Sequence, residues 1–396
     1  MELITKLAAA FAALAVVTSI PAMDREQYIQ SIKEVSGENS QQTEQPEQPE
    51  QSGDDALTAP VDVIGLCEDI TIGWNLGNSL DATGWGMNSE TSWGNPKATK
   101  ELIQTVKDAG FDAVRVPTTW YNHVDDDFNI DKQWLDRVQE VVDYAYDEGM
   151  YVILNSHHEN WNDPYEKNVK DIKKKLKKLW SQIAERFEDY GGRLIFEGMN
   201  EPRWKNTQYE WNGGNSEGRK VVNQLNEVFV STVRAAGGNN RYRALMVPTY
   251  AASASALDGF EVPEDKSIIV SIHAYSPYNF AMNENGTTTF DPDNSDWNNA
   301  GELIWLSDKL YEDYISKGIG VIIGECGTVN KNNLSERMNW AGYFPKVFGE
   351  KGIPIFLWDN NAYGTGNETF GLLHRNTLKW EYPTYIEKLV KTAKKY

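Results

Sequence analysis

The stretch LIFEGMNEPRW, residues 194–204, changes from apolar to polar within a few positions. Leu194, Ile195 and Phe196 form a continuous apolar run, and an Asn–Glu pair stands before a proline shortly after it. Continuous apolar runs are typical of strands that are buried on both faces, as in a parallel sheet. The stretch therefore predicts a buried parallel strand with polar groups just beyond its carboxyl end.

Seven more apolar runs of this kind occur along the chain: ITIGWNLG (70–77), DAVRVP (112–117), MYVILNS (150–156), RALMVP (243–248), SIIVSIHAY (267–275), IGVIIGE (319–325) and IPIFLWDN (353–360). Between them lie stretches with helical spacing of apolar residues, at Thr99–Ala109, Lys132–Glu148, 171–187, Val221–Ala236, Leu303–Ser316 and Leu334–Phe348. Eight strand-then-helix units predict an α/β protein with a (β/α)₈ TIM barrel. An open doubly wound sheet is the alternative. It is disfavoured because GWNLGNS lacks the third glycine of a dinucleotide fingerprint and the lysine of a P-loop.

The two ends of the chain differ in composition. Residues 1–22 contain an apolar run followed by small residues, which predicts a secretory signal peptide, with a short buried helix as the alternative. Residues 23–57 are predicted to be a disordered Gln/Glu/Pro-rich linker, since 36–57 hold a Glu-Gln-Pro repeat and no Lys or Arg. Residues 58–396 are predicted to be the barrel. We therefore expect a secreted, extracellular protein.

The formal net charge of −20 disfavours nucleic acid and anionic membrane surfaces as partners. The one dense basic run, 173–178, is expected to be the solvated face of a helix. Cys67 and Cys326 have no metal-ligand spacing and are expected to be free of any role. No cofactor is expected.

Polar residues follow nearly every predicted strand. In a parallel barrel the catalytic groups come from the carboxyl ends of the strands, so these residues are the candidates for a site. In chain order they are Asn78, Asp81, Arg115, His157, His158, Glu159, Asn200, Glu201, His273, Tyr275, Glu325 and Trp358.

Two of these residues suit the hydrolysis of a bond between sugars. That reaction needs one carboxylic acid to protonate the leaving oxygen and one carboxylate near the anomeric carbon. Glu201 suits the acid, and Glu325 could face it across the mouth of the barrel. Arg115 could keep one carboxylate ionised, with Tyr275 donating to the same oxygen, and Trp358 offers a flat face for a sugar ring.

These motifs resemble glycoside hydrolase family 5, in the clan A of retaining (β/α)₈ enzymes, over residues 65–390. MNEP would carry the acid/base Glu201 with Asn200 before it, and IGE would carry the nucleophile Glu325. VRVP, NSHH, IHAY and LWDN would supply Arg115, His157, His273 with Tyr275, and Trp358. GWNLGNSLDATG, ETSWGNP, VRVPTTW and HAYSPYNFA are further similar to the endoglucanase and xyloglucanase subfamily 4. The resemblance implies action on cellulose, mixed-linkage glucan and xyloglucan, and for some members xylan.

Other residues leave a choice of roles. The HHE run (157–159) could suggest a metal site, but neighbouring strand residues point to opposite faces and no H-E-x-x-H spacing exists, so no metal is expected. His157 is expected to brace the carboxylates. Asn78 and Asp81 could bind a sugar hydroxyl or hold the first loop, and binding is favoured. Two roles, sugar platform and packing, are both open for the tryptophans in predicted loops, Trp120, Trp161, Trp204, Trp211 and Trp297. Core positions are expected for Trp134, Trp180, Trp305 and Trp340.

The sequence therefore predicts a monomeric, secreted, retaining endo-β-1,4-glucanase whose partner is a β-1,4-linked polysaccharide. A xylanase or mannanase of the same fold is one alternative. A non-catalytic barrel that only binds glucan is another, and the presence of both carboxylates disfavours it.

Overall fold

The computed structural model describes residues 56–396. The predicted signal peptide (1–22) and nearly all of the predicted linker (23–57) lie outside these residues. None of the described helices combines the length and the apolar character that a bilayer crossing needs.

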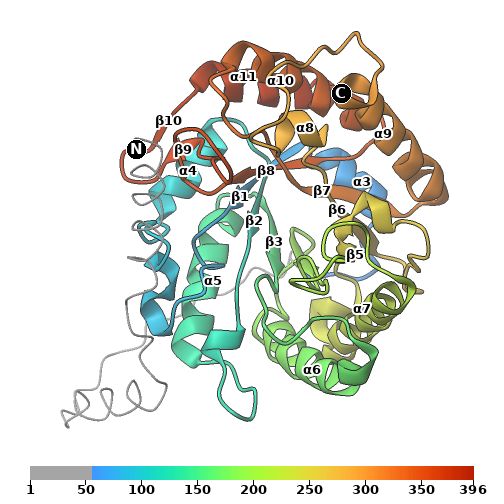
Figure 1. The fold of residues 1–396 in the computed structure, drawn as a ribbon. Coiled ribbons are helices and arrows are strands. Elements are labelled where there is room, and N and C mark those ends of the chain that lie inside the picture. Colours follow the sequence, from blue (N-terminus) through green and yellow to red (C-terminus); the bar gives the residue numbers. More distant parts are fainter. Residues whose placement is uncertain (1–55) are drawn as a thin grey trace, which may run out of the picture. The chain divides into compact units, whose positions relative to one another are not determined.

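Eight parallel strands pair in chain order and close on themselves, β8 beside β1 (Figure 1). They are β1 (Ile72–Leu76), β2 (Ala113–Val116), β3 (Tyr151–Asn155), β4 (Leu194–Glu197), β5 (Leu245–Ser253), β6 (Ile268–His273), β7 (Gly320–Cys326) and β8 (Ile355–Asp359). Each overlaps one of the eight apolar runs of the sequence, and β5 and β7 extend past theirs to Ser253 and Cys326. The predicted (β/α)₈ barrel is confirmed.

Helices surround the barrel between successive strands. The six predicted helices are α4 (Lys100–Asp108), α5 (Lys132–Tyr146), α6 (Val169–Arg186), α7 (Ser216–Ala236), α9 (Glu302–Asp313) and α10 (Leu334–Gly349). The basic run 173–178 lies on α6, whose apolar side chains Ile172, Leu176, Leu179 and Ile183 are buried, as expected for a solvated helix face.

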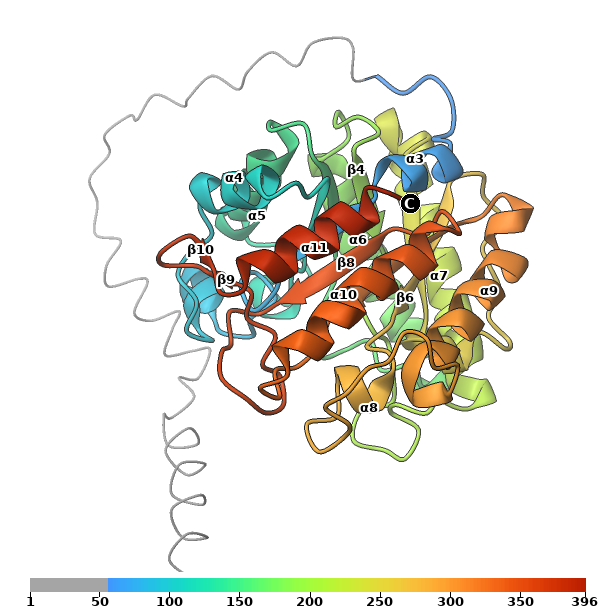
Figure 2. The ribbon, with the colours of Figure 1, turned by 90° about the horizontal axis from the view of Figure 1, so that it is seen from above.

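Three α-helices and one short hairpin were not predicted. They are α3 (Val63–Asp69), the one-turn α8 (Tyr278–Ala281), the short hairpin β9 (Leu373–His374) with β10 (Lys379–Trp380), and α11 (Pro383–Ala393). Figure 2 shows α11 beside α10, outside β8. The buried residues of α11 are spaced as in a helix, and this spacing is visible in the sequence: they include Tyr385, Ile386, Leu389 and Val390. Because α11 follows the last strand, it is the helix that completes the eighth strand–helix unit.

The barrel interior is layered. Side chains at Ala113, Ile153 and Ile195 form its lower layer together with Phe356, and α3 packs below them through Val63 and Leu66. Gly73 completes this layer, because a Cβ there would lie 2.2 Å from the Phe356 ring.

The layer above is polar. Side chains on a strand return to the same face every second residue. Two positions after the lower layer, the residues are Asn75, Arg115, Asn155, Glu197 and Trp358. The site therefore rests on a polar layer inside the barrel, directly above an apolar one.

Candidate active site

Glu325 is held by two donors at the end of β7. Arg115 donates from Nη1 to Oε1 over 2.8 Å, and the Tyr275 hydroxyl donates to Oε2 over 2.9 Å. The expectation that both donors share one oxygen is wrong, because Arg115 comes from β2 and Tyr275 follows β6, so they reach the carboxylate from different sides. Glu325 is buried, and both of its oxygens are fixed.

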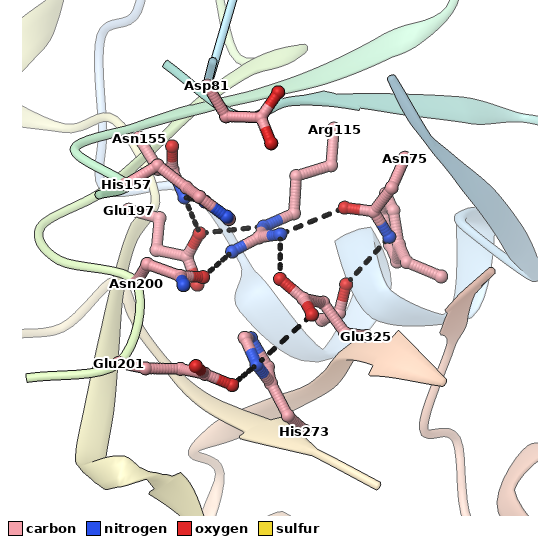
Figure 3. Close-up of polar contacts among 12 residues, drawn as sticks. Asn75, Asp81, Arg115, Asn155, His157, Glu197, Asn200, Glu201, His273 and Glu325 are labelled. Atoms are coloured by element: carbon pink, nitrogen blue, oxygen red, sulfur yellow. Dashed lines mark hydrogen bonds and ion pairs between the residues drawn. The ribbon is translucent and has the colours of Figure 1, made fainter. Parts of the chain in front are cut away.

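Glu201 lies across the mouth from Glu325, beyond the end of β4 (Figure 3). Nδ1 of His273 is 2.8 Å from Oε1 of Glu201 and 3.6 Å from Oε2 of Glu325, so the ring lies between the two carboxylates. Arg203 Nη1 is 3.3 Å from Oε2 of Glu201. One oxygen of each carboxylate and one ring nitrogen of His273 all lie within 4.8 Å of one another. The two carboxylates are therefore close enough to act on one bond.

Burial and charge oppose each other at this pair. Burial raises the pKa of Glu201, but the hydrogen bond with His273 and the charges of His273 and Arg203 outweigh it and lower the pKa below its ordinary value. Burial lowers the pKa of His273, but Glu325 and Glu201 outweigh that effect and raise it. In the absence of a sugar, the shared proton therefore favours the ring. Nε2 of His273 has no hydrogen-bond partner among the described residues, which limits how well a charged ring is satisfied.

Arg115 is the centre of the polar layer. Its guanidinium is fully buried and donates from Nε to Glu197, from Nη1 to Asn75 as well as to Glu325, and from Nη2 to Asn200. The carboxylates around it raise its pKa despite its burial. The planar fork of arginine suits this role, because it aims several donors in fixed directions.

Asn155 continues the network toward Trp358. Its Nδ2 lies 3.0 Å from Oε2 of Glu197 and 3.0 Å from Nδ1 of His157. The His157 ring is stacked parallel to Trp358, with 5.8 Å between centroids. Among the described residues, His157 therefore packs on Trp358 and connects to Glu197 through Asn155, which is less direct than the predicted bracing.

Three members of this network were not predicted: Asn75, Asn155 and Glu197. Each was visible as a polar letter inside an apolar run, in GWNLG, VILNS and LIFEG. A polar residue inside a buried strand needs partners, so these letters indicated a buried polar layer.

Asp81 holds the first loop. It is fully buried, and its oxygens accept hydrogen bonds from the backbone amides of Asn78 and Ser79 over 3.0 and 2.6 Å. Burial raises its pKa to about 7, against the effect of these amides. Asn78 adopts a left-handed φ of 56°, which the Asp81 bond supports. The favoured role of Asp81 in sugar binding is therefore wrong, because no part of its side chain reaches solvent.

His158 is half-exposed, and its Nε2 is 3.9 Å from Oδ2 of Asp81. The expectation that His157 and His158 point to opposite faces is wrong, since both follow the end of β3 and their rings contact each other edge to face at 4.4 Å. A ligand atom of each lies within 4.8 Å of one on Asp81, and Glu201, His273 and Glu325 form a second such group. Asp81 and Glu325 already use both oxygens in hydrogen bonds. The absence of a metal requirement stays a prediction.

The tryptophans divide by exposure. Trp120 is fully buried and donates to the Asn155 carbonyl, so it cannot be a sugar platform. Trp204 stacks on Tyr165, and whether it contacts a sugar stays open. Trp134, Trp180 and Trp340 are core residues as predicted. Trp305 was expected in the core and is instead exposed, because it lies on a different face of α9 from the buried Leu303, Leu306 and Leu310.

Other tryptophans are accessible. Trp93, beside the His158 ring, and Trp211, over the Arg203 guanidinium, are both exposed. These two rings lie next to residues of the mouth and are candidates for contact with sugars. Cys67 and Cys326 are buried and unpaired.

Comparisons with known proteins agree with this geometry. A family profile described as Cellulase (glycosyl hydrolase family 5) matches residues 80–364. Endoglucanase A of Ruminococcus albus is 47% identical over 346 residues, which cover 84% of this chain and 93% of the relative.

Two solved structures are similar over the same region. One is a GH5-4 broad specificity endoglucanase from Ruminococcus champanellensis with bound cellotriose, at 46% identity and a TM-score of 0.80, covering 83% of this chain and 98% of that one. The other is a GH5 xyloglucan-specific endo-beta-1,4-glucanase from a metagenomic library in complex with cellotriose, at 40% identity and a TM-score of 0.79, covering 83% and 98%.

Proposed function

Because the chain belongs to glycoside hydrolase family 5, we propose that Glu325 and Glu201 cleave a β-1,4-glucosidic bond by double displacement. The chain is a cellulase, an endo-1,4-β-glucanase. The observation that supports the mechanism is the pair itself, two carboxylates from β7 and β4 with one oxygen of each within 4.8 Å. Direct attack uses carboxyl groups about 5–5.5 Å apart, whereas an inverting pair leaves room for water at about 6.5–9.5 Å.

In the first step an oxygen of Glu325 attacks the anomeric carbon and forms a glycosyl ester. The bond from that carbon to the leaving oxygen breaks, and the leaving oxygen takes a proton from Glu201. Arg115 and Tyr275 hold the attacking carboxylate on both oxygens, so little motion is needed to reach the carbon.

The proton of this step comes from the Glu201–His273 pair. Bound glucan excludes water from the mouth, and a dry site favours neutral partners over charged ones. The proton therefore moves to Glu201 when the sugar binds, and His273 becomes neutral.

In the second step Glu201, now a carboxylate, removes a proton from water. The water oxygen attacks the anomeric carbon, the ester bond to Glu325 breaks, and Glu325 leaves as a carboxylate. Asn200, whose Oδ1 accepts from Arg115, is placed to donate from its amide nitrogen to a sugar hydroxyl. Trp358, stacked on His157, offers the ring face beneath the sugar.

The substrate is a β-1,4-linked glucan. Within that class we propose action on cellulose, mixed-linkage glucan and also xyloglucan, since similar structures include a broad specificity endoglucanase and a xyloglucan-specific enzyme. We also propose that the chain is exported, as residues 1–22 suggest, and acts as a monomer.

Two measurements test these proposals. Product profiling on cellulose, barley glucan, xyloglucan, xylan and mannan should give internal cleavage of the glucans and at most weak cleavage of mannan. Proton NMR of the first products from a soluble β-glucan should show the β-anomer first, with the α-anomer growing in by mutarotation. Turnover confined to mannan or xylan would refute the substrate class, and an initial α-anomer would refute the double displacement.

A further inference from the structure

Three exposed aromatic side chains gather near the start of α9, away from the catalytic pair. Tyr278 on α8, Trp297 on the short helical turn η7 (Trp297–Gly301) and Trp305 on α9 are 59%, 54% and 41% exposed. The rings of Trp297 and Trp305 contact each other at 5.4 Å. The segments α8 and η7 pack together, and α8 lies close to α9 in both views (Figures 1 and 2). Large exposed aromatic groups of this kind mark binding surfaces.

A polar hollow of about 490 Å³ is lined in part by Asn298 and Asn299, which follow Trp297 directly in the chain. Among residues 56–396, those that line it are all uncharged. Its side chains are amides and hydroxyls, chiefly those of Asn279, Asn283, Asn285, Thr287, Asn298 and Asn299.

The hollow is a built feature and not an open loop. Asn279 donates from Nδ2 to Asn298 over 2.9 Å and accepts at Oδ1 from Asn283 over 3.1 Å. Lys331, from the segment after β7, donates to the backbone carbonyls of Asn279 and Thr287 over 2.9 Å each. An amide offers two donors and two lone pairs, so these bonds leave hydrogen-bonding capacity for a ligand.

The chemistry of this region selects a neutral, hydroxyl-rich ligand. Aromatic faces pack on the apolar faces of sugar rings, and amides pair with hydroxyl groups. Phosphates and nucleic acids are disfavoured, because Asp291, Asp293 and Asp296 flank the hollow in sequence and the chain carries a net charge of −20.

We propose that Tyr278, Trp297, Trp305 and the hollow form an accessory glucan-binding surface, the α8–α9 surface. It rests on the glucan activity proposed above and adds a second contact for the same polymer. Tyr278 comes three residues after Tyr275, whose hydroxyl holds Glu325, so the surface is continuous in the chain with the catalytic face. A polymer held there stays near the mouth after each cleavage, which raises its effective concentration at the catalytic pair.

The experiment compares the double variant Trp297→Ala/Trp305→Ala with the wild type on long and short substrates. Migration in gels that contain soluble β-glucan measures binding, in a Glu325→Gln background that prevents turnover. We expect the double variant to lose at least about fivefold in glucan affinity, and its KM on the polymer to rise by a similar factor. On a short aryl cello-oligosaccharide, kcat/KM should stay within about twofold of wild type, since only the catalytic mouth is occupied.

Two further variants control the result. Tyr311→Ala removes an aromatic ring from the same helix, but that ring lies under the Lys351 ammonium at 5.2 Å, so glucan binding should not change. Asn298→Ala opens the hollow without touching the tryptophans, and should weaken binding in the same direction as the double variant. Circular dichroism establishes that each variant is folded.

The outcomes separate the surface from the activity. Unchanged glucan retardation in the folded double variant would overturn the α8–α9 surface. An equal loss on the short substrate would also overturn it, because the tryptophans would then belong to the cleavage site. Failure of the wild type to hydrolyse any β-glucan would instead refute the proposed function. The activity of the wild type is therefore measured before any variant is made.

Discussion

Replacing Arg115 tests whether one buried guanidinium organises the catalytic mouth. In Arg115→Lys the charge stays, but the four hydrogen bonds to Glu197, Asn75, Glu325 and Asn200 cannot all be kept by an ammonium with three donors on a shorter reach. In Arg115→Met the charge is lost as well, and two buried carboxylates lose their cation.

The expected magnitudes follow from burial. Removing one partner of a buried ion pair costs roughly 3–5 kcal/mol, so Arg115→Met should lower the free energy of unfolding by about that amount. Arg115→Lys leaves at least one buried acceptor unpaired and should cost about 1–3 kcal/mol. Because the side chains of Glu325 and Asn200 are no longer held in one orientation in either variant, kcat should fall by at least about 100-fold.

Urea unfolding followed by circular dichroism measures the stability, and steady-state kinetics on barley glucan measures kcat. Arg234→Lys is the matched control, since Arg234 makes two 2.8 Å bonds to Asp265 on the outside of the barrel. It should lose at most about 1 kcal/mol and no activity. If folded Arg115→Lys kept more than about a tenth of the wild-type kcat, positioning of the nucleophile by the guanidinium would be refuted.

Glu325→Gln and Glu201→Gln should each lower the rate on barley glucan by at least about a thousandfold with the fold intact, and retention of a tenth of the rate would refute the assignment. The pKa of His273 is raised, so the shared proton is present below that value and lost as pH rises through it. The alkaline limb of kcat/KM should therefore have its midpoint above the ordinary histidine value of about 6.5, and a midpoint below it would contradict the shared proton. Deleting residues 1–57 should leave the specific activity and melting temperature nearly unchanged, which a drop of many degrees would disprove. Dialysis against EDTA should leave activity intact, because carboxylates carry the chemistry, and restoration of lost activity by a divalent ion would show otherwise.

Strand positions were readable because a doubly covered parallel strand must be apolar throughout. All eight runs became strands, and Glu201, Glu325, Arg115, His273 and Tyr275 came together because the ends of parallel strands meet at one mouth. That part of the site follows from chain order alone.

The roles that failed depend on burial, which short sequence windows do not encode. Trp120 and Trp305 are the same residue type, yet Trp120 is fully buried and Trp305 is exposed on α9. Asp81 looked like a ligand for sugars, and only the structure shows two backbone amides occupying its oxygens. The polar layer of Asn75, Asn155 and Glu197 was visible in the sequence but was read as part of the apolar runs.

Closure of the barrel has a consequence for how the protein loses activity. Glu201 follows β4 and Glu325 lies in β7, two strands that are not neighbours, so their separation depends on the strand pairings of the closed ring. Loss of any one pairing opens the ring and lets the two carboxylates drift apart. The rate of turnover therefore reports whether the barrel is closed. During heating, activity should be lost together with the barrel structure, and no partly open form should still hydrolyse glucan.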